Sequence, residues 1–227
     1  PNVGKSTLFN ALTSSGISAE NYPFCTIEPN TGVVELPDHR LDKLAELVNP
    51  QKVLPAIVEF VDIAGLVEGA SKGEGLGNKF LSNIRETAAI VNVIRCFDDP
   101  NIVHVNGSID PVSDAETIAT ELTLADLASI EKQLVKSEKL AKTGEKEAKT
   151  FSTLLKRCLH HLNEVKPLRS LGLDSNDLEL LNPYCLFTLK PMMYVANVLE
   201  NGFKDNKYLD ALEKYANDHK APVVVIC

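Results

Sequence analysis

The sequence predicts an α/β fold in which a doubly wound, mostly parallel sheet carries an inserted α-helical hairpin. Three observations support this. The chain opens on Gly4-Lys5-Ser6, the end of a phosphate-binding loop that leads into a helix. Short apolar runs then alternate with helical patterns and end in polar residues, as in parallel sheets with a ligand site at the strand tips. A long, charged, helical stretch over residues 113–184 separates two of these runs.

Composition places the chain among soluble globular proteins. It has 227 residues, of which 44% are hydrophobic and 24% charged, enough for a sizeable core. The net charge of −8 argues against binding of nucleic acid through the overall charge of the protein, although it does not exclude a local basic face. We therefore expect no sequence-specific DNA binding. No apolar run is long enough for a membrane span, and the five scattered cysteines indicate reduced thiols in the cytoplasm.

The first element is the phosphate loop with its helix, which we expect to continue over residues 7–15. Backbone N–H groups at the start of a helix bind phosphate oxygens, and the helix dipole favours anions there. Lys5 is expected to reach the β- and γ-phosphates and is assigned a catalytic role, while the Ser6 hydroxyl is a ligand for Mg²⁺. The residues assigned to nucleotide binding here are Asn2, Val3, Gly4, Lys5, Ser6 and Thr7.

The next stretch, residues 21–30, reads as a long exposed loop because its two prolines disfavour both helix and strand. Loops of this kind often carry function. Its threonine, Thr26, is a candidate second ligand for Mg²⁺ that also senses the γ-phosphate. The alternative is a plain surface connection.

Residues 31–36 and 57–61 are predicted strands, with a short amphipathic helix over 41–48 between them. The second strand ends in Asp62, which can hold Mg²⁺ through a water. The Gly65 N–H can bond the γ-phosphate at close approach. An Asp-x-x-Gly sequence alone often marks a turn, but a strand end about 57 residues after Lys5 makes the nucleotide assignment more specific.

The glycine-rich stretch that follows, residues 65–77, predicts a loop that orders when a γ-phosphate binds, or else a passive linker. Leu66 stands where simple GTPases place a water-orienting glutamine, so a catalytic polar group must come from elsewhere or hydrolysis is very slow. Residues 90–97 form another predicted strand. The polar loop after it carries His104, which is either a catalyst or a surface or partner residue.

The middle of the chain predicts two long helices, over 114–142 and about 151–165, joined at Gly144 as an antiparallel hairpin. Apolar residues recur every three or four positions along the second helix: Phe151, Leu154 or Leu155, Cys158, Leu162 and Val165. A short helix is expected over 175–181. The charged faces of the hairpin are either solvated or reserved for a partner. The predicted domains are accordingly a first part of an α/β domain over 1–112, the inserted domain over 113–184, and a second part of the α/β domain over 185–227.

The last predicted elements are a strand over 192–198, a helix over 208–217 and a strand over 223–226. GTPases normally place Asn-Lys-x-Asp after the first of these strands, where the acid binds guanine. Here the four residues assigned to the base are Asn197, Val198, Leu199 and Glu200. Without the lysine and with a longer acid, the loop predicts a modest preference for ATP over GTP.

The motifs together resemble the Obg superfamily of P-loop NTPases and, more closely, the YchF family of Obg-like ATPases. The resemblance covers essentially the whole chain and rests on three stretches: Pro1 to Thr7, Tyr22 to Asn30, and Asp62 to Asn78. It implies a G-domain with an inserted coiled-coil domain, Mg²⁺ as cofactor and ATP or GTP as substrate. It also implies a chain that is incomplete at both ends, with a TGS domain expected after Cys227.

Members of the family are cytosolic, associate with ribosomes and have been linked to translation and stress responses. They carry a hydrophobic residue in place of the glutamine, as Leu66 does, and a loop histidine matching His104 has been proposed as the catalytic substitute. The resemblance therefore implies a ribosome-associated ATPase with weaker GTPase activity. The alternative is a nucleotide-dependent binding switch that prefers GTP and hydrolyses it negligibly.

Overall fold

A computed structural model describes residues 2–13, 30–63, 76–102, 108–142 and 145–227 of the chain. The chain divides into two compact units, residues 4–63 and residues 1–3 together with 64–227. Each unit is described by itself. No helix in the described ranges is both long enough and apolar enough to span a membrane.

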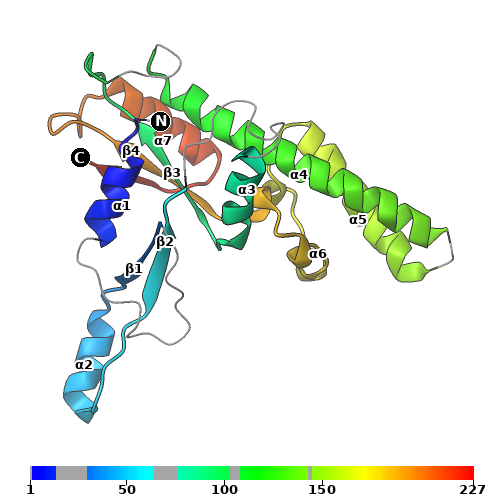
Figure 1. Ribbon diagram of the computed structural model, residues 1–227, viewed down its shortest axis with the longest axis horizontal. Coiled ribbons are helices and arrows are strands. Elements are labelled where there is room, and N and C mark those ends of the chain that lie inside the picture. The colour runs from blue at the N-terminus through cyan, green and yellow to red at the C-terminus, as the bar shows by residue number, and fades with distance from the viewer. Residues whose placement is uncertain (1, 14–29, 64–75, 103–107, 143–144) are drawn as a thin grey trace. The chain divides into compact units, whose positions relative to one another are not determined.

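The smaller unit contains α1 (Lys5–Thr13), β1 (Thr31–Glu35), α2 (His39–Val48) and β2 (Ile57–Val61). The strands pair antiparallel, with Thr31 opposite Val61 (Figure 1). Helix α1 packs so closely on β1 that a Cβ atom at Gly32 would lie 2.1 Å from the Thr13 side chain, so only glycine fits there. The predicted strands and the helix between them are confirmed, although this pair is antiparallel where a mostly parallel sheet was predicted.

The larger unit contains the predicted parallel sheet. Strands β3 (Ile90–Arg95), β4 (Met192–Asn197) and β5 (Val223–Ile226) lie side by side in that order, all parallel (Figure 1). Helix α3 (Leu76–Glu86) precedes β3, and α7 (Lys207–Asp218) connects β4 to β5. The register aligns the last residues of the three strands, so the loops that follow β3 and β4 leave from the same edge of the sheet.

Two long helices, α4 (Pro111–Ala141) and α5 (Lys146–Asn163), lie between β3 and β4 in the chain and pack side by side (Figure 1). Helix α4 begins three residues before the predicted start because the Asp110 carboxylate accepts hydrogen bonds from the Val112 and Ser113 N–H groups and Pro111 takes the first helical position. The two predicted helices are confirmed. The boundaries of a separate inserted domain, at residues 113 and 184, stay a prediction.

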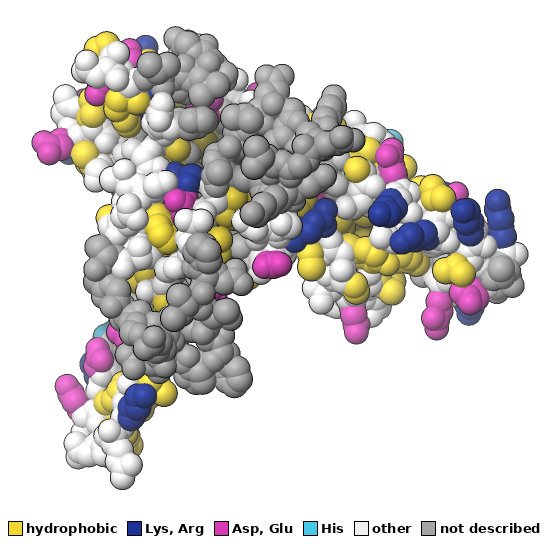
Figure 2. Space-filling model, viewed as in Figure 1, with side chains coloured by type: hydrophobic (Ala, Val, Ile, Leu, Met, Phe, Trp, Pro, Cys, Tyr) yellow, Lys and Arg dark blue, Asp and Glu magenta, His cyan; other side chains and the backbone are white. Residues whose placement is uncertain are grey.

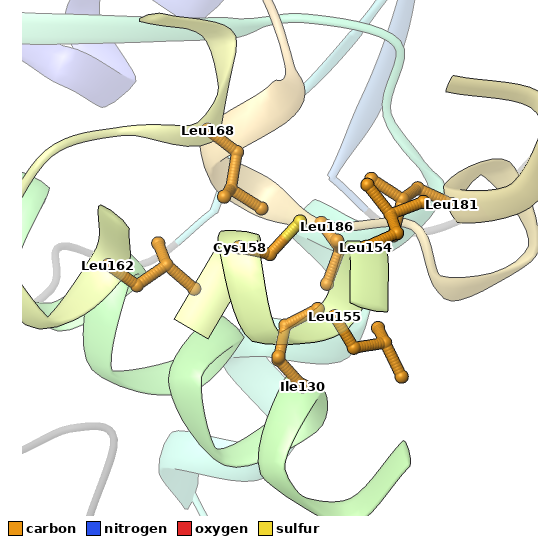
Figure 3. Packing of buried hydrophobic residues seen from close by; sticks show 8 residues of the cluster. All are labelled: Ile130, Leu154, Leu155, Cys158, Leu162, Leu168, Leu181 and Leu186. Atoms are coloured by element: carbon orange, nitrogen blue, oxygen red, sulfur yellow. The ribbon is translucent and has the colours of Figure 1, made fainter. Parts of the chain in front are cut away.

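The segment after α5 folds back through short elements: η3 (Leu168–Ser170), α6 (Ser175–Leu181), η4 (Asn182–Tyr184) and η5 (Phe187–Leu189). It shares a buried cluster with the hairpin, whose members are Ile130, Leu154, Leu155, Cys158, Leu162, Leu168, Leu181 and Leu186. Figure 3 shows these side chains gathered between α5 and the returning segment. Burial of this apolar stripe is what the predicted 3–4 spacing along α5 anticipates.

Polar contacts secure the same region. The buried Asp126 carboxylate on α4 accepts hydrogen bonds from the Phe187 N–H at 2.9 Å and the Thr188 N–H at 2.7 Å. Arg85, at the end of α3, donates to the Tyr184 carbonyl and the Ser129 hydroxyl, both at 3.2 Å. The base of the hairpin is thereby fixed to the helix that follows residues 64–75 in the chain.

Candidate functional site

The phosphate loop ends where α1 begins. Gly4 has a φ of 87°, in the left-handed region that side chains disfavour, and its carbonyl accepts the first helical hydrogen bond, from Leu8 N–H at 2.9 Å. The N–H groups of Lys5, Ser6 and Thr7 thus occupy the first turn of α1, where no carbonyl four residues earlier in the helix can accept from them. Free N–H groups in such a turn can bind phosphate oxygens.

Three predicted site residues converge at this turn. The Lys5 ammonium forms a salt bridge with the Asp62 carboxylate, and the Ser6 hydroxyl donates to the other carboxylate oxygen at 2.9 Å. Asp62 follows directly after β2, where its own N–H donates to the Asn30 carbonyl at 2.8 Å. Strand pairing therefore brings a carboxylate 57 residues away in sequence to the start of α1.

The same atoms fit Mg²⁺. This cation prefers oxygen ligands and is usually held by one or two protein groups together with substrate phosphates and waters. The hydroxyl of Ser6 and the carboxylate of Asp62 supply such oxygens, already adjacent. Ser6 is exposed, and 15% of the Asp62 side chain is exposed. The donor set therefore suits a cation that also needs outside ligands.

The loop predicted to contact the base begins at the end of β4. The Asn197 side-chain amide donates to the Val3 carbonyl at 3.0 Å. Val198 is 2% exposed, and its N–H donates to the Ile226 carbonyl, so neither group faces outward. Leu199 and Glu200 are exposed. Of the four predicted residues, Leu199 and Glu200 thus have their side chains accessible to a ligand, while Asn197 and Val198 hold the loop in place.

Three predicted residues, Thr26, Gly65 and His104, lie outside the described residues. The residues before position 103 are described, however, and they include a residue that the sequence analysis missed. Arg95 ends β3 and is 1% exposed; its guanidinium donates to the carbonyls of Phe97, Asp99 and Ile102 at 3.0–3.2 Å. One buried cation therefore shapes the loop that leads to His104. A charged residue at the end of an apolar strand is the feature of the sequence that could have identified Arg95.

Comparison with known proteins places the chain among nucleotide-binding relatives. Residues 1–123 match a family model described as 50S ribosome-binding GTPase. The chain is 59% identical over 227 residues to the ribosome-binding ATPase YchF of Haemophilus ducreyi, and 56% identical to that of Escherichia coli O157:H7. Each alignment covers the whole chain and 62% of the relative, so the chain spans less than two thirds of these proteins' length.

A solved structure is similar over the same extent. The YchF GTPase of Schizosaccharomyces pombe superposes with a TM-score of 0.83 at 38% identity, covering 100% of this chain and 63% of that protein. The YchF of Bacillus subtilis strain 168 is 50% identical over 230 residues. The similarity extends over the phosphate loop, the sheet and the helical segment between β3 and β4.

Proposed function

Because this chain belongs to the 50S ribosome-binding GTPase family, and shares the α/β P-loop GTPase fold of its YchF relatives, we propose that the protein is an Mg²⁺-dependent ATPase that acts at the ribosome. The predicted resemblance to the YchF family is confirmed. The observation that carries the proposal is the convergence of Lys5, Ser6 and Asp62 at the start of α1. We place the activity in the cytoplasm, where ribosomes are found.

Each of these three residues has a distinct role in the proposal. Lys5 exchanges its salt bridge with Asp62 for the β- and γ-phosphate oxygens when nucleotide binds, since its ammonium is a point charge suited to phosphate. Ser6 and Asp62 hold the cation with their oxygen atoms. When bound, Mg²⁺ neutralises charge that develops on the phosphates during transfer. The helix N-terminus adds N–H donors to the same oxygens.

The residues outside the described ranges complete the proposed site. Thr26 supplies a further ligand to Mg²⁺, and the Gly65 N–H bonds the γ-phosphate. Leu66 has no polar group to orient an attacking water, so His104 is proposed to do so. The fixed loop after β3 supports this role, because the three carbonyls that Arg95 binds hold the chain up to Ile102, two residues before His104.

The base preference follows from the loop after β4. A guanine-specific loop places an aspartate against the base and packs a lysine along it. Here the lysine position is Val198, which is buried, and the acid is the longer and exposed Glu200. Guanine loses its two charge-assisted bonds if Glu200 turns toward solvent, while adenine loses none. We therefore propose that ATP is preferred modestly over GTP.

The helical hairpin is proposed as an inserted domain that meets the ribosomal partner. Between residues 132 and 157 the sequence holds eight Lys or Arg residues but only three Glu, in a chain whose net charge is −8. Figure 2 shows Lys and Arg side chains spread along this hairpin on the face in view. A locally basic surface favours a polyanionic partner such as ribosomal RNA, and its contribution should weaken as salt increases.

A second function remains a candidate, because Leu66 replaces the catalytic glutamine. The protein would then be a nucleotide-dependent binding switch whose hydrolysis is incidental. Single-turnover phosphate release with and without ribosomes separates the two. Ribosome-stimulated hydrolysis supports the enzyme, and nucleotide-dependent ribosome binding without stimulation supports the switch.

The direct test of the proposed ATPase is Lys5→Ala in the full-length protein. We expect ATP hydrolysis to fall at least tenfold, because the substitution removes the charge that faces the β- and γ-phosphates. Steady-state phosphate release measures it, with fluorescent ATP-analogue titration for affinity. Lys43→Ala, which removes a lysine from the exposed helix α2, is the matched control. Hydrolysis by Lys5→Ala at the control rate would overturn the assignment of the phosphate loop.

A further inference from the structure

The larger unit contains a cavity of about 290 Å³ that the proposed ATPase does not use. Its walls come from α4, from the chain just before and within η3, from η5, from β4, from α7 and from His219, which follows α7. Met192 and Tyr194, the first and third residues of β4, line it, whereas the loop predicted to contact the base follows the sixth. The cavity therefore lies toward the opposite end of β4 from the base loop.

A guanidinium lies in this cavity with no ion-pair partner in the part of the chain that the structure describes. Arg169, in η3, is partly buried, and its one hydrogen bond among the described residues goes to the Thr188 carbonyl at the long distance of 3.4 Å. It forms no ion pair with any residue that the structure describes. A guanidinium has five N–H donors and stays charged, so several donors remain for a ligand. Partial burial of an unpaired charge is costly, and a bound anion would offset that cost.

Two tyrosines provide further donors beside it. Tyr194 is 1% exposed, and its ring meets that of Tyr215 edge to face with the centroids 6.0 Å apart. Burial raises the pKa of both phenols above the ordinary value, so both keep their protons at neutral pH. A protonated phenol can donate a hydrogen bond to an acceptor on a ligand.

The remaining walls select the kind of anion. Leu122, Val165 and Met192 supply apolar surface, which suits a ligand with an apolar or aromatic body. Glu116 lies exposed at the rim and would repel a second negative charge. The volume is at the lower end of ligand sites, so a polyphosphate nucleotide is disfavoured by both size and charge.

We propose that this cavity binds a small organic anion that carries one carboxylate or phosphate monoester group on an apolar body, with Arg169 as its anchor. The oxyanion accepts hydrogen bonds from the Arg169 guanidinium and a tyrosine hydroxyl, while the body contacts the apolar walls. Because the walls belong to both the sheet and the base of the hairpin, an occupant would tie these elements together. The inference goes beyond the proposed ATPase and does not depend on it.

Calorimetric titration of the full-length protein with simple probes tests the site. Benzoate and phenyl phosphate carry the two candidate head groups, and benzamide is a neutral probe of the same shape as benzoate. Saturating ADP and Mg²⁺ keep phenyl phosphate away from the phosphate loop. We expect both anions to bind and benzamide to fail. Arg169→Met should weaken anion binding roughly 10- to 100-fold, and Tyr194→Phe roughly 3- to 10-fold.

Arg157→Gln is the matched control, since it removes a partly exposed guanidinium on α5 that does not line the cavity. Tighter binding of benzoate or of phenyl phosphate assigns the natural ligand to carboxylates or to phosphate monoesters. Equal binding of benzamide, unchanged binding by Arg169→Met, or no binding of either anion would overturn the proposal. If Arg169→Met fails to fold by circular dichroism, Tyr194→Phe and the benzamide comparison decide it. None of these readouts requires ATP hydrolysis, so either proposal can fail alone.

Discussion

Asp126→Ala removes the carboxylate that joins α4 to η5. The effect of this substitution on the stability of the protein can be worked from the structure. Asp126 is 0% exposed. One of its oxygens accepts from the Phe187 N–H at 2.9 Å and the other from the Thr188 N–H at 2.7 Å. Phe187 and Thr188 are themselves buried, so in the variant both donors lose their acceptor inside the protein.

The expected cost follows from those two donors. A buried N–H left without an acceptor costs about 1–3 kcal/mol, so the pair costs about 2–6 kcal/mol. In a chain of this size each 1 kcal/mol shifts the Tm by roughly 2–4 °C, which gives a fall in Tm of roughly 4–24 °C. Asp126→Asn keeps one carbonyl acceptor but turns an NH₂ group toward the other donor, so we expect a smaller fall.

Thermal unfolding followed by circular dichroism at 222 nm measures the change, and amide hydrogen exchange at Phe187 and Thr188 shows whether these donors become accessible. Asp177→Ala is the control, because that carboxylate pairs with Arg157 at the surface, where such pairs contribute about 0–1 kcal/mol. A Tm for Asp126→Ala equal to that of Asp177→Ala would refute the argument that these two bonds hold the base of the hairpin.

The remaining predictions concern the site and the thiols. His104→Ala should lower the rate of ATP hydrolysis while leaving nucleotide affinity nearly unchanged, as for a group that acts in the transition state; equal losses in both would make it structural. Side-by-side titrations should show somewhat tighter binding of ATP than of GTP, because Glu200 is too long to take the guanine-binding position, and clearly tighter GTP binding would contradict this. Burial raises the pKa of Cys96 to about 12 and that of Cys158 to about 11, so iodoacetamide at pH 8 should leave both unmodified in the native protein while it alkylates the exposed Cys185, as peptide mass spectrometry would report.

Local patterns in the sequence predicted most of the secondary structure. Apolar runs of the right length predicted the strands over 57–61 and 223–226 with the observed bounds, and the 3–4 stripe on α5 predicted its buried face. These features depend on backbone sterics and on side chains a few residues apart, which the sequence displays directly. The start of α1 was predictable for the same reason, since Gly4, Lys5 and Ser6 lie within one turn of the chain.

Asp62 shows that a motif can also predict a contact between residues that are far apart in the sequence. Its place after an apolar strand predicted a role beside the phosphate loop, and the structure brings its carboxylate to Ser6. Asn197 shows the limit. Its amide N–H donates to the Val3 carbonyl, a contact that the sequence did not predict, and its assignment to the base stays a prediction. A side chain's type predicts what it can bind, not which of several partners is within reach.

What the sequence alone determined is the α/β order of elements, the two long helices and the helix that begins beside Gly4. Only the tertiary structure decided which polar groups from distant parts of the chain form hydrogen bonds with one another. Asp126 and Arg169 sit in helical segments whose patterns do not distinguish a buried polar group from a solvated one. Asp126 becomes an acceptor for a turn 61 residues away, and Arg169 becomes a partly buried cation beside two tyrosines. Such partners are set by packing, because the cost of desolvating a polar group depends on what surrounds it in space.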